Sequence, residues 1–332
     1  MPTDEHVLND ELTGTPFLEA HKDYPVDELP SWLLQDIASA VVYGKDNKCV
    51  MLPDGRKFHL DNRLNDLTGR DWTLFINSVF NTRYPTNGKE GYAHKIRRIH
   101  PSPKPPQLMC ELIKFFTKEE ELVFDCFAGV GGTLLGAAMC NRKAIGYELN
   151  PTYIEAYKKA AKDLGLDEFP VICGDVISLL AADNPLGNQE VSLMLIDPPY
   201  MNMMSKPKTG GDEIALGSDA PTPFSDDSRD LGNMERNDYF NALKRSIELA
   251  LPLIKFRGYI VVFMKDMQPK KKKLNFLHCE VAEKINELPN VYYKGMKIWA
   301  DNSSKMYPYG YPFCFVANQI HQYILVFRKE KN

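Results

Sequence analysis

The chain has 332 residues, of which 44% are hydrophobic and 25% charged, and its formal net charge is −4. This composition is typical of a globular protein with one large α/β domain or two smaller ones. The charge excludes a uniformly basic coat, so contacts with phosphate must come from local basic patches. The seven cysteines form no CxxC pair, so we expect reduced thiols and no metal site. Without a signal-peptide pattern or a membrane-spanning run, we expect a cytoplasmic protein that makes no membrane contact.

Residues 1–92 show no alternation of strands and helices, and we expect them to form an accessory region. The pattern predicts an amphipathic helix over residues 27–44 and a short helix over 71–80. Asp54-Gly55 between two apolar runs indicates a hairpin. We expect this region to serve target recognition or contacts within a homodimer.

A proline-rich segment, HPSPKPPQL, follows at residues 100–108 and leads into a helix predicted over 108–116. Its X-Pro steps force an extended path. Lys104 in this segment is a candidate partner for a carboxylate. By itself the segment is typical of a connector.

From residue 122 onward, short apolar runs alternate with helical patterns, which predicts a mostly parallel sheet covered on both faces. The predicted strands are residues 122–124, 144–147, 171–173, 191–196 and 259–264, and helices are predicted over 134–140, 152–164 and 239–254. The last two runs, 291–300 and 322–328, have no helix between them and predict a closing antiparallel hairpin.

A glycine-rich turn, DCFAGVGGT, occupies residues 125–133 where a strand passes into a helix. Glycines there allow close approach of the backbone to a ligand. The spacing does not meet G-x-G-x-x-G, because Leu134 stands at the last position. Asp125 precedes the glycines and suits a ligand with a cationic amino-acid end rather than a pyrophosphate.

Glu148 and Asp175 follow the next two predicted strands. A carboxylate at the end of the second strand is placed to accept both hydroxyls of a ribose. Asp175 is a candidate acceptor for an adenine amine. Singly, each acid is equally well explained as a helix cap. Four successive strands that all end in an acid are harder to explain in that way.

The tetrapeptide Asp197-Pro198-Pro199-Tyr200 follows the apolar run 191–196. Pro198 ends the strand, so the carboxylate, a backbone carbonyl and an aromatic ring reach the carboxyl edge of the sheet. Two acceptors and a stacking surface are suited to a planar base with an exocyclic amine. The tetrapeptide therefore indicates chemistry on an amine.

Together, residues 100–113, the glycine turn, Glu148-Leu149-Asn150-Pro151 and the tetrapeptide resemble the amino-methylating DNA methyltransferases, over roughly residues 93–329. The resemblance implies S-adenosylmethionine as the cofactor and adenine N6 or cytosine N4 as the target. It also implies a Rossmann-like sheet of seven strands, mostly parallel with an antiparallel last strand, in a domain over residues 93–332 with an inserted loop at 201–236.

The resemblance assigns roles to particular residues. The target base would be held by Asp197, Pro198, Pro199 and Tyr200. The cofactor would be held by Lys104, Asp125, Phe127, Ala128, Gly129, Gly131, Thr133, Glu148, Asp175 and Asp197. Contacts with double-stranded DNA are expected from Lys270, Lys271, Lys272, Lys273, Arg97 and Arg98, although a solvated loop explains the lysine run about as well.

Two features depart from the family pattern. Many relatives place their Asp-Pro-Pro-Tyr before the glycine turn, whereas here the order is Lys104, Gly129, Asp197. The turn reads Gly-Val-Gly-Gly where Gly-Ser-Gly-Thr is frequent, and we expect a small effect on cofactor contacts.

The expected reaction is direct methyl transfer to adenine N6 of a flipped base, with Asp at the start of the tetrapeptide favouring adenine. The long polar loop at 201–235 is a candidate cover for the flipped base. Alternatives are N4-cytosine methylation, an amine in RNA or on a protein, a nicotinamide enzyme, or a non-catalytic nucleic-acid-binding subunit. A partner from a restriction or defence system is compatible with this family.

Overall fold

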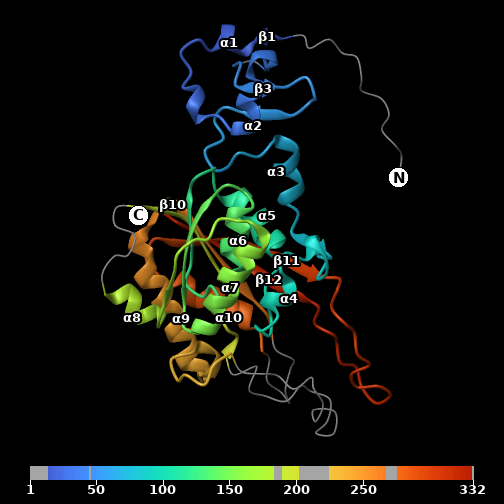
Figure 1. The fold of residues 1–332 in the computed structure, drawn as a ribbon, viewed down its shortest axis with the longest axis vertical. Coiled ribbons are helices and arrows are strands. Elements are labelled where there is room, and N and C mark those ends of the chain that lie inside the picture. The colour runs from blue at the N-terminus through green and yellow to red at the C-terminus, as the bar shows by residue number, and fades with distance from the viewer. Residues whose placement is uncertain (1–13, 45, 183–188, 202–223, 267–274, 331–332) are drawn as a thin grey trace. The chain divides into compact units, whose positions relative to one another are not determined.

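The computed structural model describes residues 14–44, 46–182, 189–201, 224–266 and 275–330 (Figure 1). The chain forms two compact units, Met1–Asn77 with Thr117–Glu119, and Ser78–Phe116 with Glu120–Asn332. The division lies at Asn77 rather than at residue 92, because Val79–Thr82 belongs to the sheet of the second unit.

The first unit contains a small antiparallel sheet in the order β1-β2-β3-β4. Its elements are β1 (Thr15–Pro16), α1 (Phe17–Ala20), a 3-10 turn (Val26–Glu28), α2 (Ser31–Leu34), a second 3-10 turn (Ile37–Ser39), β2 (Val41–Tyr43), β3 (Cys49–Met51), β4 (Lys57–His59) and α3 (Gly69–Phe75). Phe17, Leu33, Val50 and Phe58 pack in its core. The hairpin predicted at Asp54-Gly55 is confirmed by the β3–β4 pairing.

The prediction of one helix over residues 27–44 is wrong. Pro30 interrupts the pattern, and only the short α2 and two 3-10 turns form in this stretch. The β-branched Val41 and Val42 pair in the sheet instead. The helix predicted over 71–80 is also too long, since α3 ends at Phe75 and Val79 begins a strand.

The second unit is built on an eight-stranded sheet in the order β5-β11-β12-β10-β9-β6-β7-β8. Its strands are β5 (Val79–Thr82), β6 (Leu122–Asp125), β7 (Lys143–Glu148), β8 (Val171–Cys173), β9 (Val191–Ile196), β10 (Ile254–Met264), β11 (Val291–Asp301) and β12 (His321–Lys329). The pairings of β12 with β10 and β11 are antiparallel, and the others are parallel. The predicted Rossmann-like sheet is therefore confirmed, with β5 as an additional edge strand.

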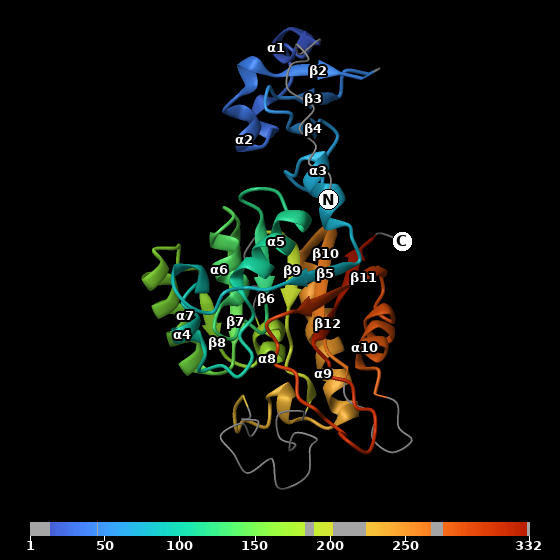
Figure 2. The same cartoon turned by 90° about the vertical axis from the view of Figure 1, so that its right-hand side faces the viewer.

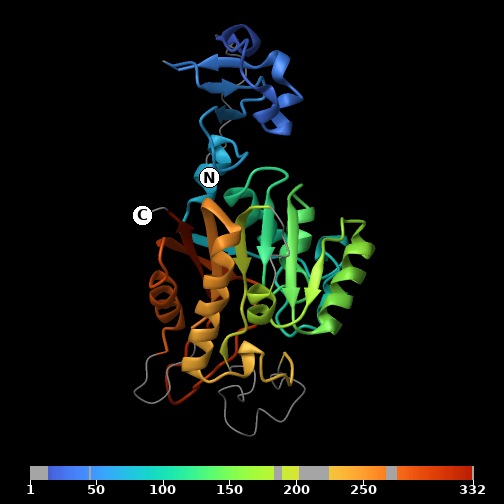
Figure 3. The same cartoon turned by 90° about the vertical axis from the view of Figure 1, so that its left-hand side faces the viewer.

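Helices cover both faces of this sheet. One face carries α4 (His94–Arg97), α5 (Pro106–Phe116), α6 (Gly132–Ala138) and α7 (Pro151–Leu164) (Figure 2). The opposite face carries α8 (Val176–Ala181), α9 (Arg236–Ala250) and α10 (Leu277–Asn286), whose apolar residues form one core with the sheet (Figure 3). Pro252 follows the end of α9 and explains why this helix stops short of the predicted residue 254. Within the described part of the chain, no helix is both long and apolar enough to cross a membrane.

Candidate active site

Four neighbouring strands place acids along one edge of the sheet. In the spatial order β9, β6, β7 and β8, the strands are followed or ended by Asp197, Asp125, Glu148 and Asp175. All four strands are parallel, so their carboxyl ends meet at the same edge. The row of acids predicted from the sequence is therefore contiguous in space, at the edge where open α/β sheets bind ligands.

A cavity of about 260 Å³ opens at this edge. Eight of the residues predicted for the site line it: Phe127, Gly129, Glu148, Asp175, Asp197, Pro198, Pro199 and Tyr200. Lys104, Asp125, Ala128, Gly131 and Thr133 lie outside the lining and are buried beside it. The cavity thus joins the predicted base-binding tetrapeptide to the predicted cofactor residues.

Asp197 is held by two side chains. Lys104 Nζ lies 2.5 Å from Asp197 Oδ2, and the Tyr200 hydroxyl donates a hydrogen bond to Asp197 Oδ1 at 2.6 Å. The Lys104 side chain is only 5% exposed and that of Asp197 17%, so water screens this ion pair poorly. The expectation that Lys104 meets a carboxylate holds, and the carboxylate is that of Asp197.

The glycine turn depends on its backbone conformation and on close packing. Gly129 has φ +52° and Gly131 has φ +75°, in the left-handed region that favours glycine. A Cβ at Gly131 would lie 2.0 Å from the Tyr157 ring. Asp125 Oδ1 accepts the backbone N–H of Phe127 at 3.0 Å and so fixes the start of the turn.

Glu148 connects the turn to helix α7. Its Oε2 accepts the N–H of Gly129 and its Oε1 accepts the N–H of Asn150, each at 2.7 Å. Burial raises the pKa of Glu148 to about 7, although these backbone hydrogen bonds act in the opposite direction. Burial also raises the pKa of Asp125 to about 7. A cationic ligand in the cavity would favour the ionised form of both groups.

Asp175 is a helix cap and a cavity residue at once. Its Oδ2 accepts the N–H and the hydroxyl of Ser178, at 2.8 and 2.7 Å, and so caps α8. Asn150 caps α7 in the same way through Thr152. The capping explanation left open by the sequence is therefore correct for Asp175. The cap uses only Oδ2 of this carboxylate and does not involve Oδ1.

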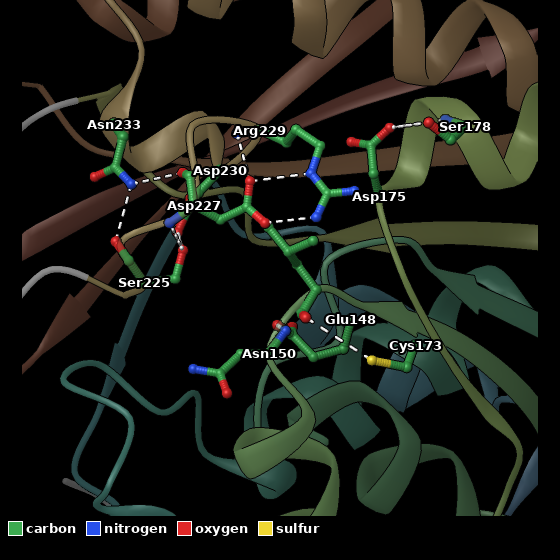
Figure 4. A network of polar contacts seen from close by, with 11 residues as sticks. Glu148, Asn150, Cys173, Asp175, Ser178, Ser225, Asp227, Arg229, Asp230 and Asn233 are labelled. Carbon is green, nitrogen blue, oxygen red and sulfur yellow. Dashed lines mark hydrogen bonds and ion pairs between the residues drawn. The ribbon is translucent and has the colours of Figure 1, made fainter.

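A second wall of the cavity is formed by residues 224–231, which belong to the loop predicted as a cover for the flipped base, although none of them was named as a site residue. Phe224 O accepts the Asn150 amide and the Tyr153 hydroxyl, each at 3.2 Å, which attaches this segment to α7. Asp230 accepts Ser225 Oγ and Gly232 N, both at 2.7 Å. Figure 4 shows the Arg229 guanidinium between Asp175 and Asp227. It forms an ion pair with Asp227, at 2.6 Å.

Aromatic rings surround the part of the cavity near the glycine turn. The His100 ring lies 5.0 Å from that of Phe224 and 4.8 Å from that of Tyr153. Burial lowers the pKa of His100 to about 4, so that the ring is neutral at physiological pH. Of these three rings, the sequence analysis pointed only to His100, which lies in the proline-rich segment. Phe224 was not predicted, because the sequence of residues 201–235 shows no periodicity.

Arg97 requires a correction. We predicted it as a DNA contact, but its side chain is 1% exposed. Its guanidinium donates to the carbonyl oxygens of Val130 and Lys104, and so joins the glycine turn to the proline-rich segment. Arg98 is exposed and stays a prediction for DNA contact. The predicted contacts Lys270, Lys271, Lys272 and Lys273, and residues 202–223 of the inserted loop, lie outside the described residues.

The cavity fits S-adenosylmethionine in its chemistry. Glu148 and Asp175 present acceptors for hydroxyl and amine groups, aromatic rings line the space beside them, and the buried Asp125 carboxyl lies under the glycine turn. Among the described residues, no group of three or more His, Cys, Asp or Glu side chains is placed to hold a metal ion.

Comparison with known proteins supports this chemistry. Residues 53–159 match the N6/N4 methyltransferase family model, described as DNA methylase. That range includes the glycine turn and Glu148 and ends before the Asp197 tetrapeptide. The type II methyltransferase M.HindIII of Haemophilus influenzae is 46% identical over 69 residues, which are 21% of this chain and 21% of that protein. These matches support a methyltransferase.

Two other similarities extend further along the chain. The tRNA (guanine(10)-N2)-dimethyltransferase of Methanocaldococcus jannaschii is 26% identical over 197 residues, covering 55% of this chain and 51% of that protein. The similarity to the crystal structure of TrmN from Thermus thermophilus covers 83% of this chain and 55% of the TrmN chain, at 13% identity and with a TM-score of 0.39. The chain spans between 18% and 51% of the length of the curated relatives it matches.

Proposed function

We propose that this protein is an S-adenosylmethionine-dependent DNA methyltransferase that methylates the N6 amine of adenine. The observation that supports this best is that Asp197 lines the same cavity as Glu148, Asp175 and Gly129 of the glycine turn. A base amine at Asp197 and a methyl donor at Glu148 would share one space. The family match and the M.HindIII similarity favour DNA as the substrate.

The residues around Asp197 can position an amine. Each carboxylate oxygen has two lone pairs, so Asp197 can accept a base N–H while Lys104 and Tyr200 remain bound. The Pro198 carbonyl is the second acceptor. Hydrogen bonds to both acceptors favour a pyramidal amine whose lone pair is available. S-adenosylmethionine, when bound, supplies an electrophilic methyl group, and the protein contributes mainly by positioning.

The target base has to leave the duplex to reach this cavity. The partly buried Tyr200 ring is the stacking surface that we assign to the flipped base. Arg98 and the four lysines at 270–273 are proposed phosphate contacts, and residues 1–92 a proposed recognition or dimer region. A homodimer and a restriction or defence partner stay predictions.

Product analysis tests the proposal. The protein is incubated with methyl-labelled S-adenosylmethionine and unmethylated DNA, RNA or protein, and the digested products are identified by chromatography and mass spectrometry. We expect N6-methyldeoxyadenosine, lost in Asp197→Ala and retained in Asp163→Ala, an exposed aspartate on α7.

Each other product has a defined meaning. N4-methyldeoxycytidine would keep the role of Asp197 and overturn the choice of base. Label found only in RNA or protein would overturn DNA as the substrate. Methyl transfer that persists in Asp197→Ala would overturn the assigned site, and transfer to none of the three would favour a non-catalytic subunit.

A further inference from the structure

The loop that joins β11 to β12, residues 302–320, exposes an unusual set of aromatic side chains. Phe313 and Phe315 are each 92% exposed and Tyr311 is 81% exposed. Tyrosine or phenylalanine occupies every second position from 307 to 315. Exposed apolar groups at this density on a soluble surface indicate an interaction site.

The tip of this loop has a defined backbone structure. The N–H groups of Phe313 and Cys314 donate to Gly310 O at 2.7 and 2.8 Å. Gly310 has φ +78°, and a Cβ there would lie 2.3 Å from Cys314 O, so only glycine fits. Asn318 closes the base of the loop through two hydrogen bonds with the backbone of Tyr307, at 2.9 and 2.7 Å. The aromatic side chains are therefore displayed by an organised turn.

Strand register places the loop at the edge that carries the active site. Ala300 of β11 pairs with His321 of β12, and Tyr323 pairs with Met264 at the carboxyl end of β10. Gln322 lines the cavity, and its Oε1 lies 3.3 Å from the Tyr200 hydroxyl. Figure 2 shows the loop, in red, projecting beyond the edge where β6, β7 and β9 end.

The chemistry of the loop suits nucleic acid. Residues 302–320 contain one lysine, Lys305, and no acidic residue, although the whole chain is acidic. The loop therefore adds no charge repulsion toward phosphate. Aromatic rings stack on bases regardless of sequence, and apolar side chains inserted between base steps help to open a duplex. A loop beside the base-binding cavity is well placed for both.

We propose that Tyr311, Phe313 and Phe315 form a wedge that stacks on the bases of duplex DNA beside the target base and stabilises the opened duplex. This inference rests on the proposed function, because it assigns to the same site the surface that opens its substrate. The specific consequence is that loss of the wedge should lower kcat/KM only when the target base is paired.

The test compares two duplexes that carry the methylation site mapped from the wild-type product. In one duplex the target base is paired, and in the other the opposite position is abasic, so that opening costs little. On the paired duplex, Phe313→Ser/Phe315→Ser should lower kcat/KM by about tenfold or more, and on the abasic duplex it should stay within about twofold of wild type. Phe256→Ser, an exposed phenylalanine near the start of β10, is the matched control and should behave as wild type on both.

Each remaining outcome either supports or overturns the proposed wedge. An equal loss on both duplexes, or no loss on either, overturns the wedge. A loss accompanied by a change from dimer to monomer in analytical ultracentrifugation, without recovery on the abasic duplex, identifies the loop as a contact between copies and also overturns it. If the wild type methylates no DNA, the proposed function fails separately. The wedge is then judged by fluorescence anisotropy with a labelled random-sequence duplex, where equal affinity of variant and wild type overturns it and weaker binding supports it.

Discussion

Lys104 Nζ and Asp197 Oδ2 lie 2.5 Å apart, although 93 residues separate them in the chain. The ammonium group also lies 5.2 Å from the ring centre of Phe263 and 5.9 Å from that of Tyr200. The proline-rich segment therefore carries a cation to the carboxylate that we assign to the target amine. This contact joins the proline-rich segment to the Asp197 tetrapeptide.

Removing the cation should leave Asp197 with an uncompensated charge in a poorly solvated site. We expect Lys104→Met to lower the free energy of unfolding by about 3 kcal/mol, the usual cost of breaking a buried pair. The double variant Lys104→Met/Asp197→Asn should recover a large part of that loss, because neither charge remains. Urea denaturation measures both, and additive losses in the double variant would contradict a direct pair.

The ring and the hydroxyl of Tyr200 should contribute differently to methyl transfer. Tyr200→Phe keeps the stacking surface and loses the hydrogen bond to Asp197, so kcat/KM should fall by only about fivefold. Tyr200→Ala also removes the ring and should cost about tenfold more, in line with base–aromatic stacking. Steady-state kinetics on DNA distinguish the two, and equal losses would argue against a stacking role.

Gly131 should tolerate alanine much less well than Gly165. Both have positive φ, +75° and +64°, so alanine introduces similar backbone strain at each. At Gly131 the new methyl group also meets the Tyr157 ring, whereas nothing lies within 4 Å at Gly165. We expect Gly131→Ala to destabilise the protein by about 1–3 kcal/mol more than Gly165→Ala and to weaken cofactor binding. Thermal unfolding and calorimetric titration test this, and equal stabilities would contradict the packing.

Binding of S-adenosylmethionine should weaken as the pH falls through about 7. The pKa of Glu148 is raised to about 7, so below that pH the side chain is protonated and accepts hydrogen bonds less well. From pH 8 to pH 6 the affinity should fall by about tenfold. Glu148→Gln should bind more weakly with a shallower pH dependence. Isothermal titration calorimetry measures both, and an unchanged pH slope in Glu148→Gln would assign the titration to Asp125, whose pKa is also about 7.

The same pKa shift predicts the pH dependence of stability. The folded-state pKa of Glu148 lies above its ordinary value of 4.5. Its contribution to the free energy of unfolding is therefore fully present below pH 4.5 and is lost as the pH rises through about 7. The ligand-free wild type should lose stability relative to Glu148→Gln as the pH rises from 4.5 to about 7, and urea denaturation over that range measures the difference.

Substitutions at Arg97 and Arg98 should have different effects, on stability for Arg97 and on DNA binding for Arg98. Arg97→Met removes two buried hydrogen bonds and should destabilise the protein by about 2–3 kcal/mol, because the Val130 and Lys104 carbonyl groups lose their donor. Arg98→Ala should leave stability unchanged, and it should weaken DNA binding and lessen its dependence on salt. Thermal unfolding and anisotropy titrations at two salt concentrations test the pair. Normal stability in Arg97→Met would contradict its structural role.

The sequence by itself determined the strand–helix alternation of the second unit and the acids at the ends of four strands. Both are local properties: apolar runs of strand length indicate buried strands, and Pro198 or a run of glycines ends them at a definite residue. The antiparallel pairing of β11 with β12 was also predictable, because no helix lies between them.

Only the tertiary structure decided which side chains meet. The identical letters of an Arg-Arg pair do not reveal that Arg97 is buried and Arg98 exposed, since that depends on how α4 packs. The attachment of Phe224 to Asn150 joins segments 74 residues apart, and the Lys104–Asp197 pair joins segments 93 apart. Such contacts follow from strand order and packing, which no local pattern encodes.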